Sequence, residues 1–191
     1  ESINLGNAIS FLDDGPSITV TASADPAAAS LQVDETTLAT DATANFTSLF
    51  SNNTPSYGTD GAGAVTSVYS LGIKASAQDS GLVDTATGQK VYLYLESGVV
   101  VGRVGAAGVA KADGAISFTV SNDAGSVTLD QQRALTHPTN PNNNEATTLS
   151  AADLVTLTRT DTITDKDGDS TSDGESINLG NAISFLDDGP S

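Results

Sequence analysis

The sequence lacks cysteine, methionine and tryptophan, and it contains a single histidine and few basic residues. Without cysteine there are no disulfides and no thiolate ligands. The 191 residues carry 7 Lys and Arg against 24 Asp and Glu, a formal net charge of −17. This charge argues against nucleic acid and anionic membranes as partners, because phosphate binding needs clustered basic residues. No apolar run approaches the roughly 20 residues of a membrane-spanning helix. The chain therefore has to hold itself together by core packing, by a metal, or by both.

The most informative feature of the sequence is an internal repeat. Residues 1–17 read ESINLGNAISFLDDGPS, and residues 175–191 repeat all seventeen letters at an offset of 174 residues. Identity over that length predicts a tandem array of nearly identical domains. We therefore expect residues 1–16 to be the tail and linker of a preceding repeat, 17–186 to form one domain, and 187–191 to be the linker to the next repeat.

The residue pattern within the repeat predicts β structure. Apolar and polar side chains alternate over residues 90–96, Ser97 and Gly98 form a turn, and the apolar run 99–104 follows, which predicts a hairpin. The threonine-rich stretch 154–164 predicts another long strand. About seven to nine short strands joined by Gly, Asn and Asp turns are typical of a β-sandwich. Further strands are expected at 18–22, 31–37, 65–75, 116–120, 127–129 and 170–179, one helical turn at 149–154, and surface loops at 51–63 and 137–144.

Acidic residues gather at three places along the sequence. The run 165–169 reads D-x-D-G-D, and alternating carboxylates in a tight turn can aim their oxygens at one point. Ca²⁺ takes six to eight oxygen ligands at about 2.3–2.6 Å, so the run suits it. It is not an EF-hand, because Ser170 stands where that loop has glycine and Ser176 where it has glutamate. A solvated acidic turn is the alternative. The candidate calcium ligands of the three places are Asp13, Asp14, Asp34, Glu35, Asp165, Asp167, Asp169, Asp187 and Asp188.

The order of the strands predicts where these acidic places lie. If the strand at 18–22 runs away from the N-terminal end of the domain, the strand at 31–37 returns and brings Asp34 and Glu35 back to that end. The strand at 170–179 has to run toward the C-terminal end, so the turn that precedes it also lies at the N-terminal end. The incoming linker, the turn and the strand end are thus expected to converge between consecutive domains. So many carboxylates would repel one another strongly unless a divalent cation compensated them.

The sequence resembles the extender repeats of bacterial RTX adhesins, which are giant proteins exported by type I secretion. The segments that carry the resemblance are ITDKDGDS at 163–170, LQVDET at 31–36 and the DDGPS junction at 13–17, in a long tandem repeat. The resemblance implies an all-β, Greek-key, immunoglobulin- or cadherin-like sandwich with calcium at the junctions between domains. It also implies an extracellular place on the bacterial surface, where the repeats hold a distal adhesive region away from the cell for adhesion and biofilm formation. The glycine-rich nonapeptide that names the wider group is absent from this chain.

Near-identical repetition favours a structural module, because many copies add length whereas a binding tip usually occurs once. The expected partners are neighbouring repeats of the same chain, with the domain monomeric in solution and out of contact with membranes.

Other functions find less support in the same residues. We expect no enzyme and no catalytic residue, because no carboxylate pair lies in an aromatic-lined cleft of the kind glycosidases use. His137 lies in a loop rich in Pro and Asn, without a Cys or a second His, and is expected to be solvated rather than a base or metal ligand. Tyr57, Tyr69, Tyr92 and Tyr94 are expected to pack on or beside the core. The alternative is that they form a carbohydrate- or ice-contacting face, which would make the domain itself an adhesive module.

Overall fold

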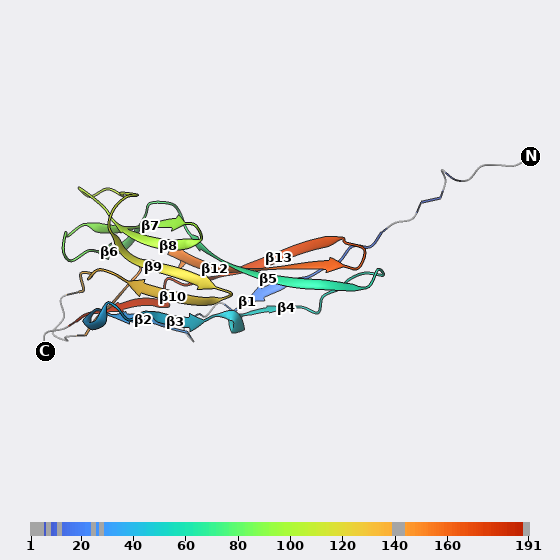
Figure 1. Cartoon of the computed structure of the whole chain (residues 1–191), viewed down its shortest axis with the longest axis horizontal. Helices are drawn as coiled ribbons and strands as arrows, with labels where there is room; N and C mark the ends of the chain where they lie inside the picture. The colour runs from blue at the N-terminus through green and yellow to red at the C-terminus, as the bar shows by residue number, and fades with distance from the viewer. Residues whose placement is uncertain are drawn as a thin grey trace, which may run out of the picture.

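The structure is a computed structural model that describes residues 6, 9–10, 13–23, 26, 29–138 and 144–188. These residues form fourteen β-strands and three short 3-10 helices, so the domain is all-β. The molecule is elongated, with a broad body at one end and a narrow extension at the other (Figure 1). Within the described residues no helix is long and apolar enough to cross a membrane.

The body is built on a six-stranded antiparallel sheet with the strand order β3-β10-β9-β8-β7-β6. Its central strands follow one another as hairpins, so each pairs with its neighbour in the sequence. A second, three-stranded sheet has the order β11-β14-β2, in which β14 pairs antiparallel with β11 and parallel with β2. The strands of the two sheets are β3 (Ala42–Asn45), β6 (Gln78–Val83), β7 (Lys90–Glu96), β8 (Val99–Val104), β9 (Ile116–Asp123), β10 (Ser126–Gln131), β2 (Leu31–Asp34), β11 (Ala146–Thr148) and β14 (Ile183–Leu186).

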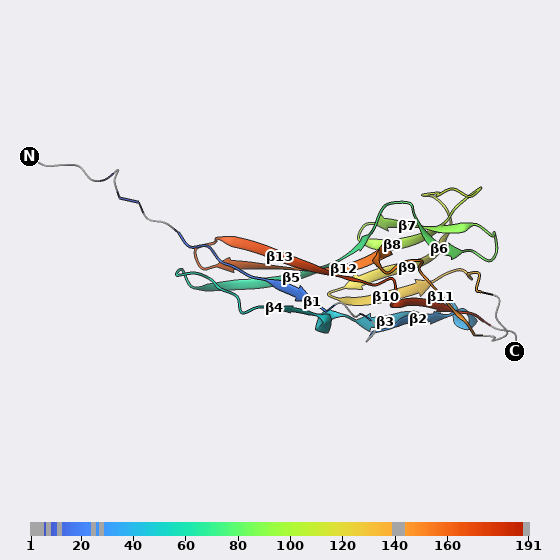
Figure 2. The same cartoon turned by 180° about the vertical axis from the view of Figure 1, so that it is seen from behind.

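The extension consists of two small sheets that lie beyond the body, as both views show (Figures 1 and 2). One has the order β13-β12-β5, and the other pairs β1 with β4. Polar side chains link the two sheets: Asp173 Oδ2 accepts a hydrogen bond from the Val20 amide at 2.7 Å, and Asn52 Nδ2 donates to Asp161 at 2.7 Å. The strands are β5 (Ala62–Ile73), β12 (Val155–Asp165), β13 (Ser170–Asn178), β1 (Val20–Ala22) and β4 (Phe50–Asn52).

One apolar core fills the body. Phe118 on β9 and Phe185 on β14 are fully buried, and their ring centroids lie 5.2 Å apart, so the core connects the six-stranded sheet to the three-stranded one. The long strand β12 takes part at its body end, where Leu157 is fully buried. Since β12 pairs with β5 and β13 along nearly its whole length, it carries the extension out from the core.

Most strands expected from local alternation are present. The hairpin of β7 and β8 and the pair of β12 and β13, with a turn between them at 166–169, confirm the expectations. Strands β3, β4, β6, β11 and β14 were not expected. Four of them are only three or four residues long, and the sequence of β6, QDSGLV, does not alternate apolar and polar residues. The helical turn expected at 149–154 is the shorter 3-10 helix η5 (Ala152–Leu154), and Ser150 does not cap it.

The expected return of the second strand is wrong. Strand β2 pairs in parallel with β14, and β14 runs toward the C-terminal end, so β2 runs in that direction too. The Leu31 amide donates to the Ala182 carbonyl at 2.8 Å, which starts this pairing. Strand β2 therefore runs away from the incoming linker instead of returning toward it (Figure 1). Asp34, the last residue of β2, and Glu35 after it thus lie at the end of the domain opposite the incoming linker. The expected boundaries of the repeat, 1–16 and 187–191, lie partly outside the described residues.

Candidate metal centre

The turn between β12 and β13 is organised by one carboxylate. Asp165 Oδ1 accepts hydrogen bonds from the amides of Gly168 at 3.0 Å and Asp169 at 2.8 Å. Gly168 has a φ of +110°, a conformation that favours glycine. Asp165 is 4 % exposed, and its other oxygen, Oδ2, is buried without a hydrogen-bond partner among the described residues. The turn thus leaves a buried carboxylate oxygen free for another ligand.

The incoming linker is pinned beside this turn by the loop that precedes β5. Ser17 and Ser56 exchange two backbone hydrogen bonds at 2.8 and 3.0 Å. The Thr59 hydroxyl donates to Asp14 Oδ1 at 2.7 Å, and this bond lowers the pKa of Asp14. Gly58 has a φ of +68°, and a Cβ there would collide with the Asp14 carbonyl, so this close approach requires glycine.

Five carboxylates meet where the linker, the loop and the turn come together. Asp13, Asp60 and Asp167 place one oxygen each within 4.8 Å of one another, and Asp165, Asp167 and Asp169 do the same. The two groups share Asp167, so they form one continuous set, which we call the N-terminal cluster. Within the part of the chain that the structure describes, Asp60 Oδ2, like Asp165 Oδ2, is buried without a hydrogen-bond partner.

Burial and crowding of negative charge raise the pKa of three carboxyl groups in the N-terminal cluster. Loss of solvation raises the pKa of Asp60, and the charges of Asp13, Asp14 and Asp165 raise it further. The neighbouring Asp165 carboxylate raises the pKa of Asp167, and the neighbouring Asp13 carboxylate raises the pKa of Asp169. These shifts mean that the fold holds the carboxylates so close together that their ionised forms repel one another. A hard divalent cation with several oxygen ligands suits the arrangement, and Ca²⁺ has this preference.

A second group of possible ligands lies at the opposite end of the domain. One ligand atom each of Glu35, His137 and Asp187 lies within 4.8 Å of the other two. His137 Nε2 is 3.1 Å from Glu35 Oε1, and the two side chains are only 4 % and 3 % exposed. We call this group the C-terminal cluster. The expectation that His137 is a solvated loop residue is therefore wrong: it is buried against a carboxylate.

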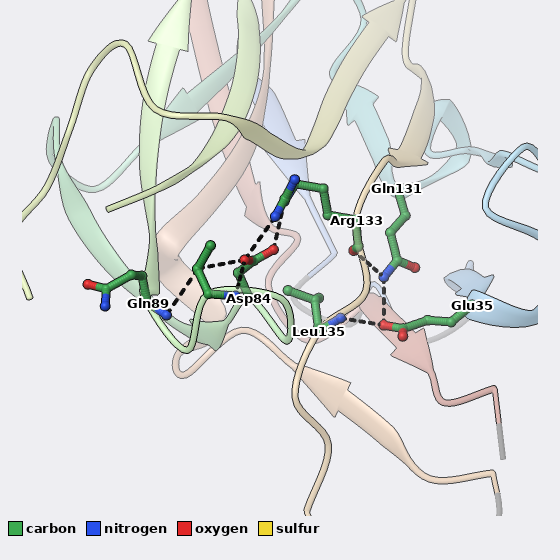
Figure 3. A network of polar contacts seen from close by, with 7 residues as sticks. Glu35, Asp84, Gln89, Gln131, Arg133 and Leu135 are labelled. Atoms are coloured by element: carbon green, nitrogen blue, oxygen red, sulfur yellow. Dashed lines mark hydrogen bonds and ion pairs between the residues drawn. The ribbon is translucent and has the colours of Figure 1, made fainter. Parts of the chain in front are cut away.

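Glu35 also anchors the segment that follows β10. Its Oε1 accepts hydrogen bonds from Gln131 Nε2 and from the Leu135 amide, each at 2.8 Å (Figure 3). Arg133, between these two residues, points the other way and donates from Nε and one terminal nitrogen to Asp84 at 2.7 and 3.0 Å. Segment 131–137 is thus fastened to Glu35, just after β2, on one side and to Asp84, just after β6, on the other.

The expected site residues thus divide between the two ends. The N-terminal end holds Asp13, Asp14, Asp165, Asp167 and Asp169, as expected. Glu35 and Asp187 lie in the C-terminal cluster. Asp34 instead caps helix η3 (Glu35–Thr37) by accepting a hydrogen bond from the Thr36 amide at 2.8 Å. The side chain of Thr36, and after it the Thr36 amide, lowers the pKa of Asp34. Asp188 is exposed and belongs to neither cluster.

Sequence reasoning missed Asp60. It stands in a loop that showed only turn-forming residues, and it lies more than 100 residues before the turn that it joins. The available signal was the dipeptide Asp60-Gly61, a turn signal just before a long β strand. In the fold the Lys166 amide donates to the Gly61 carbonyl at 3.2 Å, which ties this turn to the turn at 165–169.

The tyrosines are distributed over several elements: Tyr92 is buried, and Tyr69 packs edge-on against Phe50 with ring centroids 5.7 Å apart. Core packing is therefore confirmed for these two.

Fold and site together define an all-β domain with a carboxylate-rich centre at the end where its linker enters. The chain belongs to the family described as a domain of unknown function, DUF5801, whose model matches residues 30–180. No curated protein and no solved structure matches the chain.

Proposed function

We propose that this domain is a calcium-stabilised structural extender of a giant bacterial surface adhesin exported by type I secretion. In this proposal, tandem copies outside the cell project a distal binding region away from the surface, for adhesion and biofilm formation. The domain is neither an enzyme nor the adhesive tip. Its partners are the repeats before and after it.

The observation that carries the proposal is the position of the N-terminal cluster. Five carboxylates gather where the linker sequence DDGPS enters, and the same linker sequence stands at the other end of the chain. A cation there would tie the linker to the domain and remove the repulsion that raises the pKa of Asp60, Asp167 and Asp169. Binding to the folded state alone adds stability by mass action. Calcium is scarce in the cytosol and abundant outside, so the chain would stay loose for export and become rigid afterwards.

We further propose that the body is a Greek-key β-sandwich of the immunoglobulin or cadherin type. The contact between Phe118 and Phe185 supports it, because aromatic side chains from two sheets meet in one core. The elongated outline supports an extender, since each copy adds the length of both body and extension (Figure 2).

Calcium titration of the chain tests whether calcium binds to the domain and stabilises it. We expect calcium to raise the melting temperature over that in excess chelator. Asp167→Ala and Asp14→Ala should weaken calcium binding and leave the β core folded. Asp130→Ala is the control, because Asp130 lies on β10 in the body and its carboxylate accepts only from Gln132 among the described residues. A melting temperature that does not respond to calcium, or equal effects from the three substitutions, would exclude this mechanism.

A second candidate function, a ligand-binding module for carbohydrate or ice, has one observation in its favour. Five threonines lie at alternate positions of β12, and most of the residues opposite them on β5 and β13 are Gly, Ala, Ser or Thr. Neighbouring strands of a sheet are about 4.8 Å apart, and alternate residues of one strand are about 6.8 Å apart. The hydroxyl side chains on this face therefore lie on a regular lattice. Thr158 and Thr162 hydrogen-bond Ser176 and Ser172, each at 2.7 Å. An ice-affinity assay and a glycan array decide between the candidates, and Thr160→Lys in the middle of the row should abolish any binding seen.

A further inference from the structure

The duplicated segment places one residue of the repeat in two different clusters. Asp13 belongs to the N-terminal cluster, and Asp187, which occupies the same position of the repeated seventeen residues, belongs to the C-terminal cluster. We propose, on the basis of the tandem array of the proposed function, that a single linker aspartate joins both clusters at each junction. Glu35 and His137 of one repeat and the N-terminal cluster of the next then form one interdomain site.

The hydrogen bonds on either side of the linker show how short the junction is. The Asp187 amide donates to the Glu145 carbonyl at 3.0 Å, so Asp187 is held by the repeat that ends there. The next position, Asp188, is equivalent to Asp14, whose carboxylate is held by Thr59 of the repeat that begins there. The chain passes from one domain to the next across a single peptide bond, and no linker residue between the two is left unanchored.

The shared aspartate limits the separation of the two clusters. Its carboxylate has two oxygens, so one can face Glu35 and His137 while the other faces Asp60 and Asp167. The two clusters then lie no farther apart than two spans of 4.8 Å and the width of one carboxylate. Segment 131–137 of one repeat and turn 165–169 of the next therefore face each other.

Each cluster contains a buried polar atom that the single domain leaves without a partner. Asp165 is 4 % exposed and has an unpaired Oδ2, and the His137 side chain is 4 % exposed and has an unpaired Nδ1 among the described residues. An unpaired buried polar group is costly, so such atoms usually mark a missing ligand. A divalent cation accounts for the first, and a polar group of the adjoining repeat accounts for the second.

The proposal predicts that His137 affects calcium binding only across a junction. In the single chain, His137→Gln should leave calcium affinity unchanged, because the N-terminal cluster lies at the other end. In a chain of two repeats joined at the 174-residue period, the same substitution in the first repeat should weaken the junction calcium roughly tenfold, as loss of an outer-shell partner typically does. Asp130→Asn in the first repeat is the control, expected to be silent in both chains. Unchanged affinity in the two-repeat His137→Gln chain, with calcium still bound by the single chain, would overturn the sharing.

A distance measurement tests the junction even if calcium does not bind. The chain has no cysteine, so Thr136→Cys in the first repeat and Lys166→Cys in the second give unique positions for spin labels; both residues are exposed. We expect one short, narrow distance distribution. A long or broad distribution means that the two clusters do not meet and refutes the shared aspartate, whereas a narrow one without calcium binding refutes only the calcium proposal.

Discussion

Asp165→Asn is expected to have opposite effects on stability with and without calcium. Asparagine keeps the Oδ1 acceptor that the amides of Gly168 and Asp169 use, so the turn should survive. In place of the unpaired Oδ2 it puts an amide group, which can donate to the neighbouring Asp167 carboxylate. In chelator, the variant should therefore be more stable than the parent chain. In calcium, it should be the less stable of the two, because the amide NH2 group that takes the place of Oδ2 cannot ligate a cation.

The sizes of the two effects make the inversion measurable. An unsatisfied buried acceptor costs about 1–3 kcal/mol, so the variant should gain about that much in chelator. Calcium at 1,000 times its dissociation constant stabilises the parent by about 4 kcal/mol, and the variant should gain almost none of it. For a domain of this size, one kcal/mol corresponds to about 2–4 °C in melting temperature.

Thermal melts in excess chelator and in saturating calcium provide the assay, with Asp130→Asn as the matched control on the body. A variant that loses the same number of degrees in both conditions would mean that Asp165 is only a structural turn residue. A calcium shift as large as that of the parent would mean that the ion does not use this carboxylate.

Two further predictions concern the pH dependence of stability and an ion pair in the body. In chelator, lowering the pH from 7 to about 4.5 should raise the melting temperature. Asp60, Asp167 and Asp169 have raised pKa values in the fold, so the stability linked to them is present at low pH and is lost as the pH rises through those values. Carboxylates with lowered pKa values destabilise the fold mainly below their ordinary values, 3.8 for Asp84 and 4.5 for Glu96, so they oppose the rise only at the acid end of this range. Saturating calcium should reverse the sign of the pH effect, and a fall of the melting temperature in chelator would contradict the repulsion. Arg133→Ala should lower the free energy of unfolding, measured in urea, by about 3 kcal/mol, because it leaves the fully buried Asp84 carboxylate without its bidentate partner. The loss should be the same with and without calcium. A loss under about 1 kcal/mol would show that water replaces the arginine.

The local parts of the fold could be predicted from the sequence because local contacts produce them. The hairpin of β7 and β8 and the turn at 165–169 join segments only a few residues apart, and alternation and turn residues specify such pairs. For the same reason, the acidic turn and the linker aspartates could be named as candidate ligands without coordinates, and the repeat showed that one linker sequence occurs at both ends.

Tertiary structure alone decided which carboxylates meet. The parallel pairing of β2 with β14 joins segments about 150 residues apart, and nothing in either segment's pattern specifies a parallel partner. That pairing places Glu35 at the C-terminal end, where its carboxylate contacts the buried side chain of His137. Asp60 likewise joins the N-terminal cluster through a loop contact across more than 100 residues. A sequence pattern shows which residues can hold a cation, but their grouping depends on the direction of each strand, which long-range burial determines.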